Sequence, residues 1–186
     1  MKIIGITGTL GAGKGTIVDY LTTHHGFKHF SVRGYLLKII NQKGMEVNRD
    51  SMVDIANELR ATNSPSFIAE ELFKEAMESG QNCIIESIRT LGEVNALKAK
   101  GNFSLFAVDA NRKLRYERIL ERASETDRIS FDTFVENEER EMNSTDPNKQ
   151  NIAACMQLAD YTFTNDGSLE ELYKEIDVVL ENSPIK

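Results

Sequence analysis

Several residue types are scarce in this chain of 186 residues, which has two cysteines, three histidines, three prolines and no tryptophan. Cys83 and Cys155 lie far apart and form no CxxC pair, so we expect two buried thiols in a reducing cytosol rather than a disulfide. His24, His25 and His29 lack partners at zinc-ligand spacing, and we expect them to be structural or surface groups. No Ser–His–Asp, Cys–His or haem pattern stands out. These absences argue against a zinc site and against a catalytic triad.

Long apolar runs and an excess of positive charge are missing as well. No run of about 18 apolar residues occurs, which predicts that no helix spans a membrane. The net charge of −7 at pH 7 argues against general affinity for nucleic-acid backbone, so any anionic ligand must be held by locally clustered arginines. Because the sequence begins directly with an apolar run, we expect no signal or transit peptide and a cytoplasmic protein.

Short apolar runs alternate with helical patterns along the chain, in an ordinary composition of 40% hydrophobic and 27% charged residues. The runs that we expect to form strands are Lys2–Thr7, Phe27–Ser31, Asn82–Ser87, Ser104–Asp109 and Tyr161–Thr164. This alternation predicts a three-layer α/β fold, with a five-stranded parallel sheet covered by helices on both faces. We expect residues 82–87 to lie beside the N-terminal strand. The length suits a single domain over residues 1–186.

Glycine is concentrated in one stretch, GTLGAGKGT over Gly8–Thr16, between the first predicted strand and an amphipathic helical pattern. This context is typical of a phosphate-binding loop, and a glycine-rich turn that binds nothing is the alternative. Lys14 is expected to contact the β- and γ-phosphates of ATP. Thr16 is expected to help hold Mg²⁺, one residue later than in the strict pattern because Gly15 follows the lysine. The loop residues that we expect to bind ATP are Gly8, Leu10, Gly11, Ala12, Gly13, Lys14, Gly15 and Thr16.

Arginines lie near the predicted strand ends, where parallel sheets bind their ligands. Arg89 follows the third strand, and we expect it to grip an acceptor's phosphate as a bidentate fork and to take part in catalysis. Glu86, at the end of that strand, is expected to hold Mg²⁺ through water or to orient the acceptor; alternatively it pairs with Arg89. Arg118 and Arg122 lie four residues apart on one predicted helix face. We expect them to flank the transferring phosphoryl group opposite Lys14, and an exposed charged helix is the alternative.

Two long connections resemble insertions into this fold. Residues 33–76 contain three helical patterns, and we expect Arg33 and Arg60 there to bind the acceptor. Residues 124–151 are highly polar, and we expect a lid whose closure brings Arg128 toward the phosphates as a further catalytic group. Because this segment has few large apolar residues, we expect only loose attachment to the core. A solvated helical surface is the alternative.

These motifs resemble those of P-loop nucleoside monophosphate kinases over nearly the whole chain. GTLGAGKGT resembles the glycine loop of adenylate kinases, and ESIRT (Glu86–Thr90) resembles the segment by which that family holds its monophosphate. RYERILER resembles the family's arginine pair on the helix that enters the lid. The C-terminal ADYTFTNDGSLEEL is similar to dephospho-CoA kinases, which adds Asn165 and Gly167 to the expected ATP site. The middle, with SVRGYLL and NRDSMVDIANELR, resembles the kinase-like domain associated with deoxycytidylate deaminases and archaeal adenylate-kinase-related proteins.

The resemblance implies a kinase that uses ATP and Mg²⁺ to phosphorylate a nucleoside or deoxynucleoside monophosphate. Dephospho-CoA kinase is the alternative in the same class, and a catalytically weak nucleotide-binding sensor or regulatory module is the alternative outside it. Two departures motivate the second alternative: Leu37 stands near the place of an acceptor-site arginine, and Glu86 replaces the usual aspartate. We expect nucleotide substrates as partners, no nucleic acid, no membrane, and self-association as a homodimer.

Overall fold

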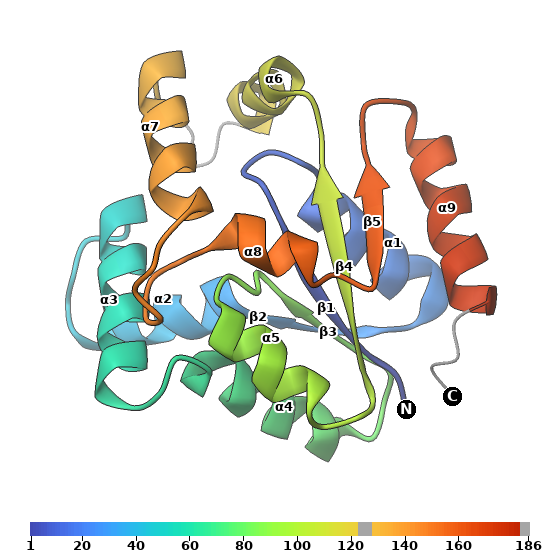
Figure 1. Ribbon diagram of the computed structural model, residues 1–186, viewed down its shortest axis with the longest axis horizontal. Coiled ribbons are helices and arrows are strands. Elements are labelled where there is room, and N and C mark those ends of the chain that lie inside the picture. Colours follow the sequence, from blue (N-terminus) through green and yellow to red (C-terminus); the bar gives the residue numbers. More distant parts are fainter. Residues whose placement is uncertain (123–127, 183–186) are drawn as a thin grey trace.

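Five parallel strands form the centre of the computed structural model, which describes residues 1–122 and 128–182 (Figure 1). The strands are β1 (Ile3–Gly8), β2 (Lys28–Ser31), β3 (Cys83–Glu86), β4 (Phe103–Asp109) and β5 (Tyr161–Thr164). Their order across the sheet is β2-β3-β1-β4-β5, and each of the four pairings is parallel. The predicted three-layer α/β fold is confirmed, together with the place of residues 82–87 beside the N-terminal strand.

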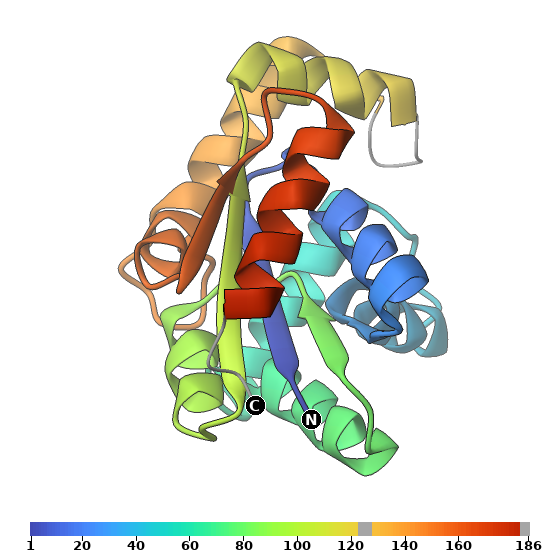
Figure 2. The same ribbon diagram turned by 90° about the vertical axis from the view of Figure 1, so that its right-hand side faces the viewer.

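Helices connect the strands and cover both faces of the sheet (Figures 1 and 2). They are α1 (Lys14–His25), α2 (Val32–Gln42), α3 (Arg49–Thr62), α4 (Phe67–Ser79), α5 (Leu91–Lys98), α6 (Arg112–Arg122), α7 (Phe131–Met142), α8 (Ile152–Gln157) and α9 (Leu169–Asn182). The three helical patterns that the sequence places over residues 33–76 correspond to α2, α3 and α4. Within the described ranges, none of the helices has the length and apolarity needed to cross a membrane.

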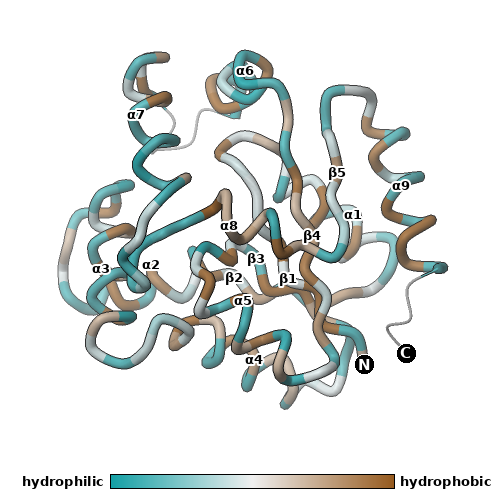
Figure 3. Tube along the Cα trace, viewed as in Figure 1, coloured by the Kyte–Doolittle hydropathy of each residue, from teal (hydrophilic) through white to brown (hydrophobic). Residues whose placement is uncertain are grey.

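Alternation along the strands builds a separate hydrophobic core on each face of the sheet. Ile3 packs on one face with residues of α2, α3, α4, α5 and α8, whereas Ile4 packs on the other face with residues of α1 and α9. Cys83 and Cys155 belong to the first core and are buried free thiols, as predicted. Figure 3 shows that the strands are largely hydrophobic, whereas α7 is in large part hydrophilic.

Reciprocal caps fix the starts of two helices near the ends of the sheet. The Thr90 side chain accepts from the backbone N–H of Glu93, and the Glu93 carboxylate accepts from the backbone N–H of Thr90, so α5 begins with a capping box. Ser168 and Glu171, whose Ser-x-x-Glu spacing is typical of a capping box, make the same pair of bonds before α9. The first cap matters for function because it fixes the turn that leaves β3.

The carboxyl ends of β1, β3 and β4 meet at one edge of the sheet because the three strands are parallel. The glycine loop follows β1, the turn over residues 86–90 follows β3, and α6 follows β4. In Figure 1, α6 and α7 lie beyond this edge, and α7 stands between α3 and α6. The fold therefore brings four chain segments, far apart in the sequence, around one place.

Candidate active site

The glycine loop between β1 and α1 has a backbone that needs glycine at its two ends. Gly8 has a φ of 142° and Gly13 has a φ of 103°, conformations that side chains rarely adopt. A Cβ at Gly13 would lie 2.3 Å from Nδ2 of Asn165, so no side chain fits there. The same Nδ2 donates a hydrogen bond of 2.9 Å to the carbonyl oxygen of Ala12. Asn165 therefore braces the loop from the end of β5.

Lys14 folds back over the loop that carries it. Its Nζ donates to the carbonyl oxygens of Gly8 and Thr9 at 2.8 and 2.7 Å. Burial, with help from the nearby positive charge of Arg89, lowers the pKa of Lys14 to about 7, against the opposing effects of Glu86 and Glu141. The charge of this ammonium group therefore changes near neutral pH.

A cavity of about 670 Å³ opens beside the glycine loop. Its walls come from the loop and α1, from α2 and α3, from the turn after β3, from α6, and from Glu141 of α7 and Gln150 before α8. The predicted site residues that line it are Leu10, Gly11, Gly13, Lys14, Gly15, Thr16, Arg33, Arg60, Glu86, Arg89, Arg118 and Arg122. The fold thus brings most of the predicted donor, acceptor and catalytic residues to one cavity.

One wall of the cavity is apolar. It consists of Val32, Leu36, Met52, Val53 and Ala56, all from α2 and α3. This wall lies on the inserted helices rather than on the glycine loop. The inserted helices therefore offer a surface that suits a planar or aliphatic part of a ligand.

Glu86 lies at the end of β3 with its carboxylate hydrogen-bonded to His29 at 3.2 Å. Although burial acts to raise its pKa, His29, Lys14 and Arg89 together hold the pKa of Glu86 below its usual value. The carboxylate therefore stays ionised near neutral pH. The next residue, Ser87, lines the cavity and has a φ of 70°, which is uncommon for a residue with a side chain. His29 is exposed, as expected of a surface group, and it also contacts this predicted functional carboxylate.

Arg89 is held by partners other than Glu86. Its Nη1 donates to Oε2 of Glu141 at 2.8 Å and to Oε1 of Gln150 at 2.6 Å. The other carboxylate oxygen of Glu141 pairs with Nη2 of Arg49. Burial acts to raise the pKa of Glu141, but Arg89 and Arg49 outweigh it and keep the carboxylate ionised. Arg89 thus lies on the cavity wall within a network that reaches α3 and α7.

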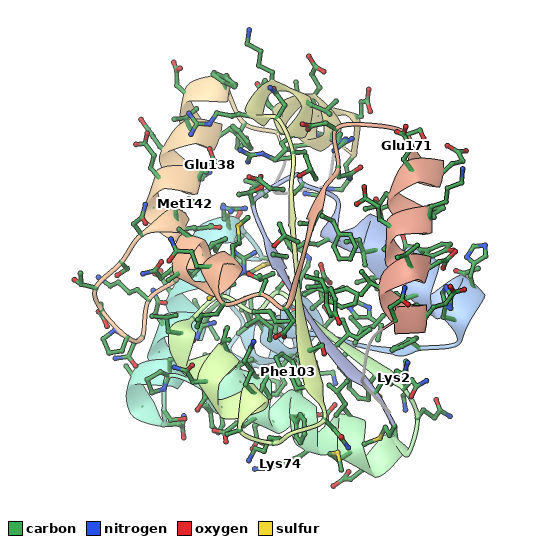
Figure 4. The ribbon with its side chains drawn as sticks, turned by 45° about the vertical axis from the view of Figure 1, so that its right-hand side comes forward. Lys2, Lys74, Phe103, Glu138, Met142 and Glu171 are labelled. Atoms are coloured by element: carbon green, nitrogen blue, oxygen red, sulfur yellow. The ribbon has the colours of Figure 1, made fainter. Side chains whose placement is uncertain are left out.

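Helix α7 is attached to its neighbours mainly by charged groups. Glu138 is buried and pairs with Arg115 and Arg112 of α6, and Figure 4 labels it on α7. Phe134 is fully buried, and its ring is tilted against that of Tyr116 on α6, with the centroids 5.5 Å apart. The sequence predicts loose attachment from the shortage of apolar residues, and it overlooks these buried ion pairs. Residues 124–127 of the predicted lid lie outside the described residues.

Comparison with known proteins agrees with this geometry. A family model described as an AAA domain matches residues 4–144, which include the glycine loop, the inserted helices and α6. This chain belongs to the AAA domain family. This chain also belongs with the UPF0200 proteins. One of them, from Methanococcus maripaludis (strain C7 / ATCC BAA-1331), is 30% identical over 186 residues, and the match covers 98% of this chain and 97% of that protein.

Solved structures of similar fold include TT1252 from Thermus thermophilus, with a TM-score of 0.65 at 19% identity, covering 98% of this AAA domain chain and 97% of that chain. Another is shikimate kinase from Bacteroides thetaiotaomicron, with a TM-score of 0.55 at 16% identity, covering 97% of this chain and 98% of that chain. This chain therefore has the three-layer fold of P-loop kinases.

Arg60 borders the cavity, but its side chain is fully buried and is hydrogen-bonded to Glu93. Its Nε and Nη2 donate to Oε1 of Glu93 at 3.1 and 2.8 Å, while Oε2 of Glu93 accepts from the backbone N–H of Arg89 at 2.7 Å. The expected direct contact between Arg60 and an acceptor stays a prediction. Through Glu93, which binds both residues, Arg60 stabilises the turn that carries Arg89.

Five of the predicted site residues do not line the cavity: Gly8, Ala12, Asn165, Gly167 and Arg128. The first three stabilise the glycine loop by hydrogen bonds: the Gly8 carbonyl oxygen accepts from Lys14, and the Ala12 carbonyl oxygen accepts from the Asn165 side chain. Gly167 is exposed in the turn before α9, and Arg128 is exposed before α7. A contact of Arg128 with phosphate stays a prediction that needs a movement of the chain.

Sequence reasoning left Glu141, Gln150 and Arg115 out of the site. Arg115 is buried and donates to the carbonyl oxygens of Ala110 and Leu10 at 2.8 and 3.1 Å, so it ties α6 to the glycine loop. One signal was available, since Arg112, Arg115, Arg118 and Arg122 follow one another at helical spacing. Glu138, the partner of Arg115 on α7, and Glu141, which pairs with Arg49 and Arg89, carry no local sequence pattern that marks them as buried.

Proposed function

We propose that this AAA domain protein is a phosphotransferase that moves the γ-phosphate of ATP to a nucleoside or deoxynucleoside monophosphate. The observation that carries the proposal is that cationic side chains from three separate segments line one cavity. Lys14 comes from the glycine loop, Arg89 from the turn after β3, and Arg118 and Arg122 from α6. Phosphoryl transfer needs this kind of positioning and charge neutralisation more than it needs covalent chemistry.

The donor end of the proposed site is the glycine loop. Its backbone N–H groups and Lys14 would hold the β- and γ-phosphates of ATP. Thr16 and the ionised Glu86 both line the cavity, and they suit Mg²⁺, which binds a few protein oxygens together with phosphates and water. Among the residues that the structure describes, no cluster of three or more His, Cys, Asp or Glu could form a metal cage. A cation shared with the phosphates fits this donor set.

The acceptor end is the wall formed by α2 and α3. A nucleobase would lie against the apolar residues of this wall, and the acceptor's phosphate would face Arg89. In the reaction, an oxygen of the acceptor phosphate forms a bond to the γ-phosphorus, and the bond from that phosphorus to the β–γ bridging oxygen breaks. ADP leaves with the electron pair, and Arg118 and Arg122 balance charge on the transferring group.

The test is an assay of ADP formation from Mg-ATP with a panel of acceptors. The panel contains ribo- and deoxyribonucleoside monophosphates, dephospho-CoA, and shikimate as an acceptor without phosphate. We expect turnover with at least one monophosphate, and we expect Arg89→Met to lower it by a factor of about 100 or more. Absence of turnover with every acceptor would refute the proposal, and turnover with dephospho-CoA alone would select that alternative.

A nucleotide-binding regulatory module is the second candidate, and one observation favours it. Arg89 is engaged by Glu141 and Gln150, and Lys14 is engaged by loop carbonyls, so both predicted phosphate ligands have partners within the chain. Such a module would bind ATP and change its hydrogen-exchange pattern without acceptor-stimulated ADP release. The same panel, combined with a binding measurement, separates the two candidates.

A further inference from the structure

Glu141 occupies the place where two arginines of the cavity converge. Its side chain is 4% exposed, and its two carboxylate oxygens contact Arg49 from α3 and Arg89 from the turn after β3. Gln150 adds a neutral oxygen to Arg89 at 2.6 Å. All four residues line the cavity. Two guanidinium groups that share one anion form a geometry that carboxylate and phosphate oxygens satisfy equally well.

The charges around Arg49 and Arg89 let the Glu141 carboxylate compete with other anions for these two arginines. Arg49 and Arg89 supply two positive charges, while Glu141 and Glu86 supply two negative charges, because the pKa of each carboxyl group is held below its usual value. Lys14 adds less than a full positive charge above pH 7, since its pKa is about 7. An incoming phosphate dianion would therefore meet little net attraction while Glu141 stays in place.

We propose that Arg49 and Arg89 form the anion subsite for the acceptor's phosphate, and that Glu141 is an internal carboxylate which this phosphate must displace. The inference rests on the proposed function for the identity of the anion as an acceptor phosphate. This arrangement makes Glu141 a specificity residue. A phosphate dianion brings more negative charge to the arginines than the carboxylate that it displaces, so its binding is favoured. A neutral acceptor, or one that carries a single carboxylate, gains little by displacing Glu141.

Displacement has a structural consequence for α7. Glu141 is in the last turn of this helix, and the neighbouring Arg140 pairs with Asp50 of α3 at 3.1 Å. Once the bond from Glu141 to Arg49 breaks, the exposed Arg140–Asp50 pair is the ion pair that still joins α7 to α3 among the described residues. Exposed pairs contribute little. Anion binding is therefore expected to loosen the C-terminal turn of α7.

The test compares inorganic phosphate binding by the wild-type protein, Glu141→Gln and Glu139→Gln, measured by calorimetry at pH 8. Glu139 is exposed on the same helix, so its variant makes the same change of charge away from the arginines. We expect Glu141→Gln to bind phosphate about tenfold more tightly and Glu139→Gln to match the wild type. Adding Arg89→Met to Glu141→Gln should abolish the gain, which places the anion at the pair rather than at the glycine loop.

An unchanged or weakened phosphate affinity in a folded Glu141→Gln variant would overturn the inference. If that variant does not fold, amide hydrogen exchange of the wild-type protein decides: phosphate should speed exchange in residues 138–142, and slower or unchanged exchange would refute displacement. Neither measurement involves turnover. A protein that shows both responses and phosphorylates no acceptor would refute the proposed kinase activity alone.

Discussion

Proton uptake by Lys14 is the most direct consequence of the loop geometry. In the ligand-free protein its pKa is about 7, because the ammonium group is buried and lies near Arg89. Nucleotide phosphates would surround the same group with negative charge and raise its pKa toward or above the ordinary value of about 10.5. At pH 8, about 0.9 of the free protein carries a neutral lysine, so binding should take up about 0.9 proton per site. The uptake falls to about 0.5 at pH 7 and about 0.1 at pH 6.

The sign of the linkage follows from this uptake. Because the bound state holds more protons than the free state above pH 7, the apparent affinity for nucleotide falls as pH rises, by about 50-fold between pH 7 and pH 9. Calorimetry of Mg-ADP binding in buffers of different ionisation enthalpy measures the number of protons directly. Lys14→Arg is the matched control, because its guanidinium stays protonated throughout this range and reports only the protons of the nucleotide and the remaining residues. A wild-type uptake equal to that of Lys14→Arg at pH 8 would refute the reasoning.

Three further predictions concern stability and catalysis. Gly15→Ala should raise the free energy of unfolding by about 0.5–1 kcal/mol, because Gly15 is helical and a Cβ there meets open space; a loss of stability in denaturant titration would contradict this. Arg60→Met should lower the free energy of unfolding by about 3–5 kcal/mol, because it leaves the Glu93 carboxylate buried without its cation. Addition of Glu93→Gln should recover part of that loss, and a single variant as stable as the wild type would be evidence against it. Arg128→Ala should lower kcat by about tenfold or more with little change in ATP affinity, because its contact is expected only in the reacting state; full activity of the variant would remove Arg128 from the mechanism.

Local signals explain why the sequence predicts the fold well. The strand at Tyr161–Thr164 has the expected bounds, and the other four differ by one residue at one or both ends. Each is a short apolar run between helical patterns, and the glycine loop is confined to nine consecutive residues. Where a contact depends on neighbours in the chain, as in the Ser168–Glu171 cap, pattern and structure agree.

The rest of the site depends on contacts between distant segments. Arg49 meets Glu141 across 92 positions, and Arg89 meets it across 52. Composition alone presents Glu141 as one of many exposed acids in a polar segment, because a buried carboxylate is recognised only when its cations are placed around it. The same reason explains Arg60, whose partner Glu93 belongs to a helix that begins about thirty residues later in the chain.

A single guanidinium connects the two ends of the active region. Arg115 donates to the carbonyl oxygen of Leu10 in the glycine loop and pairs with Glu138 on α7. The loop and this helix are therefore expected to open as one cooperative unit, with a shared free energy of opening. A nucleotide that orders the loop would then also order α7 around Glu138, whereas displacement of Glu141 loosens the last turn of the same helix. Because one ligand orders what the other loosens, binding of the two substrates would be coupled negatively through conformational entropy.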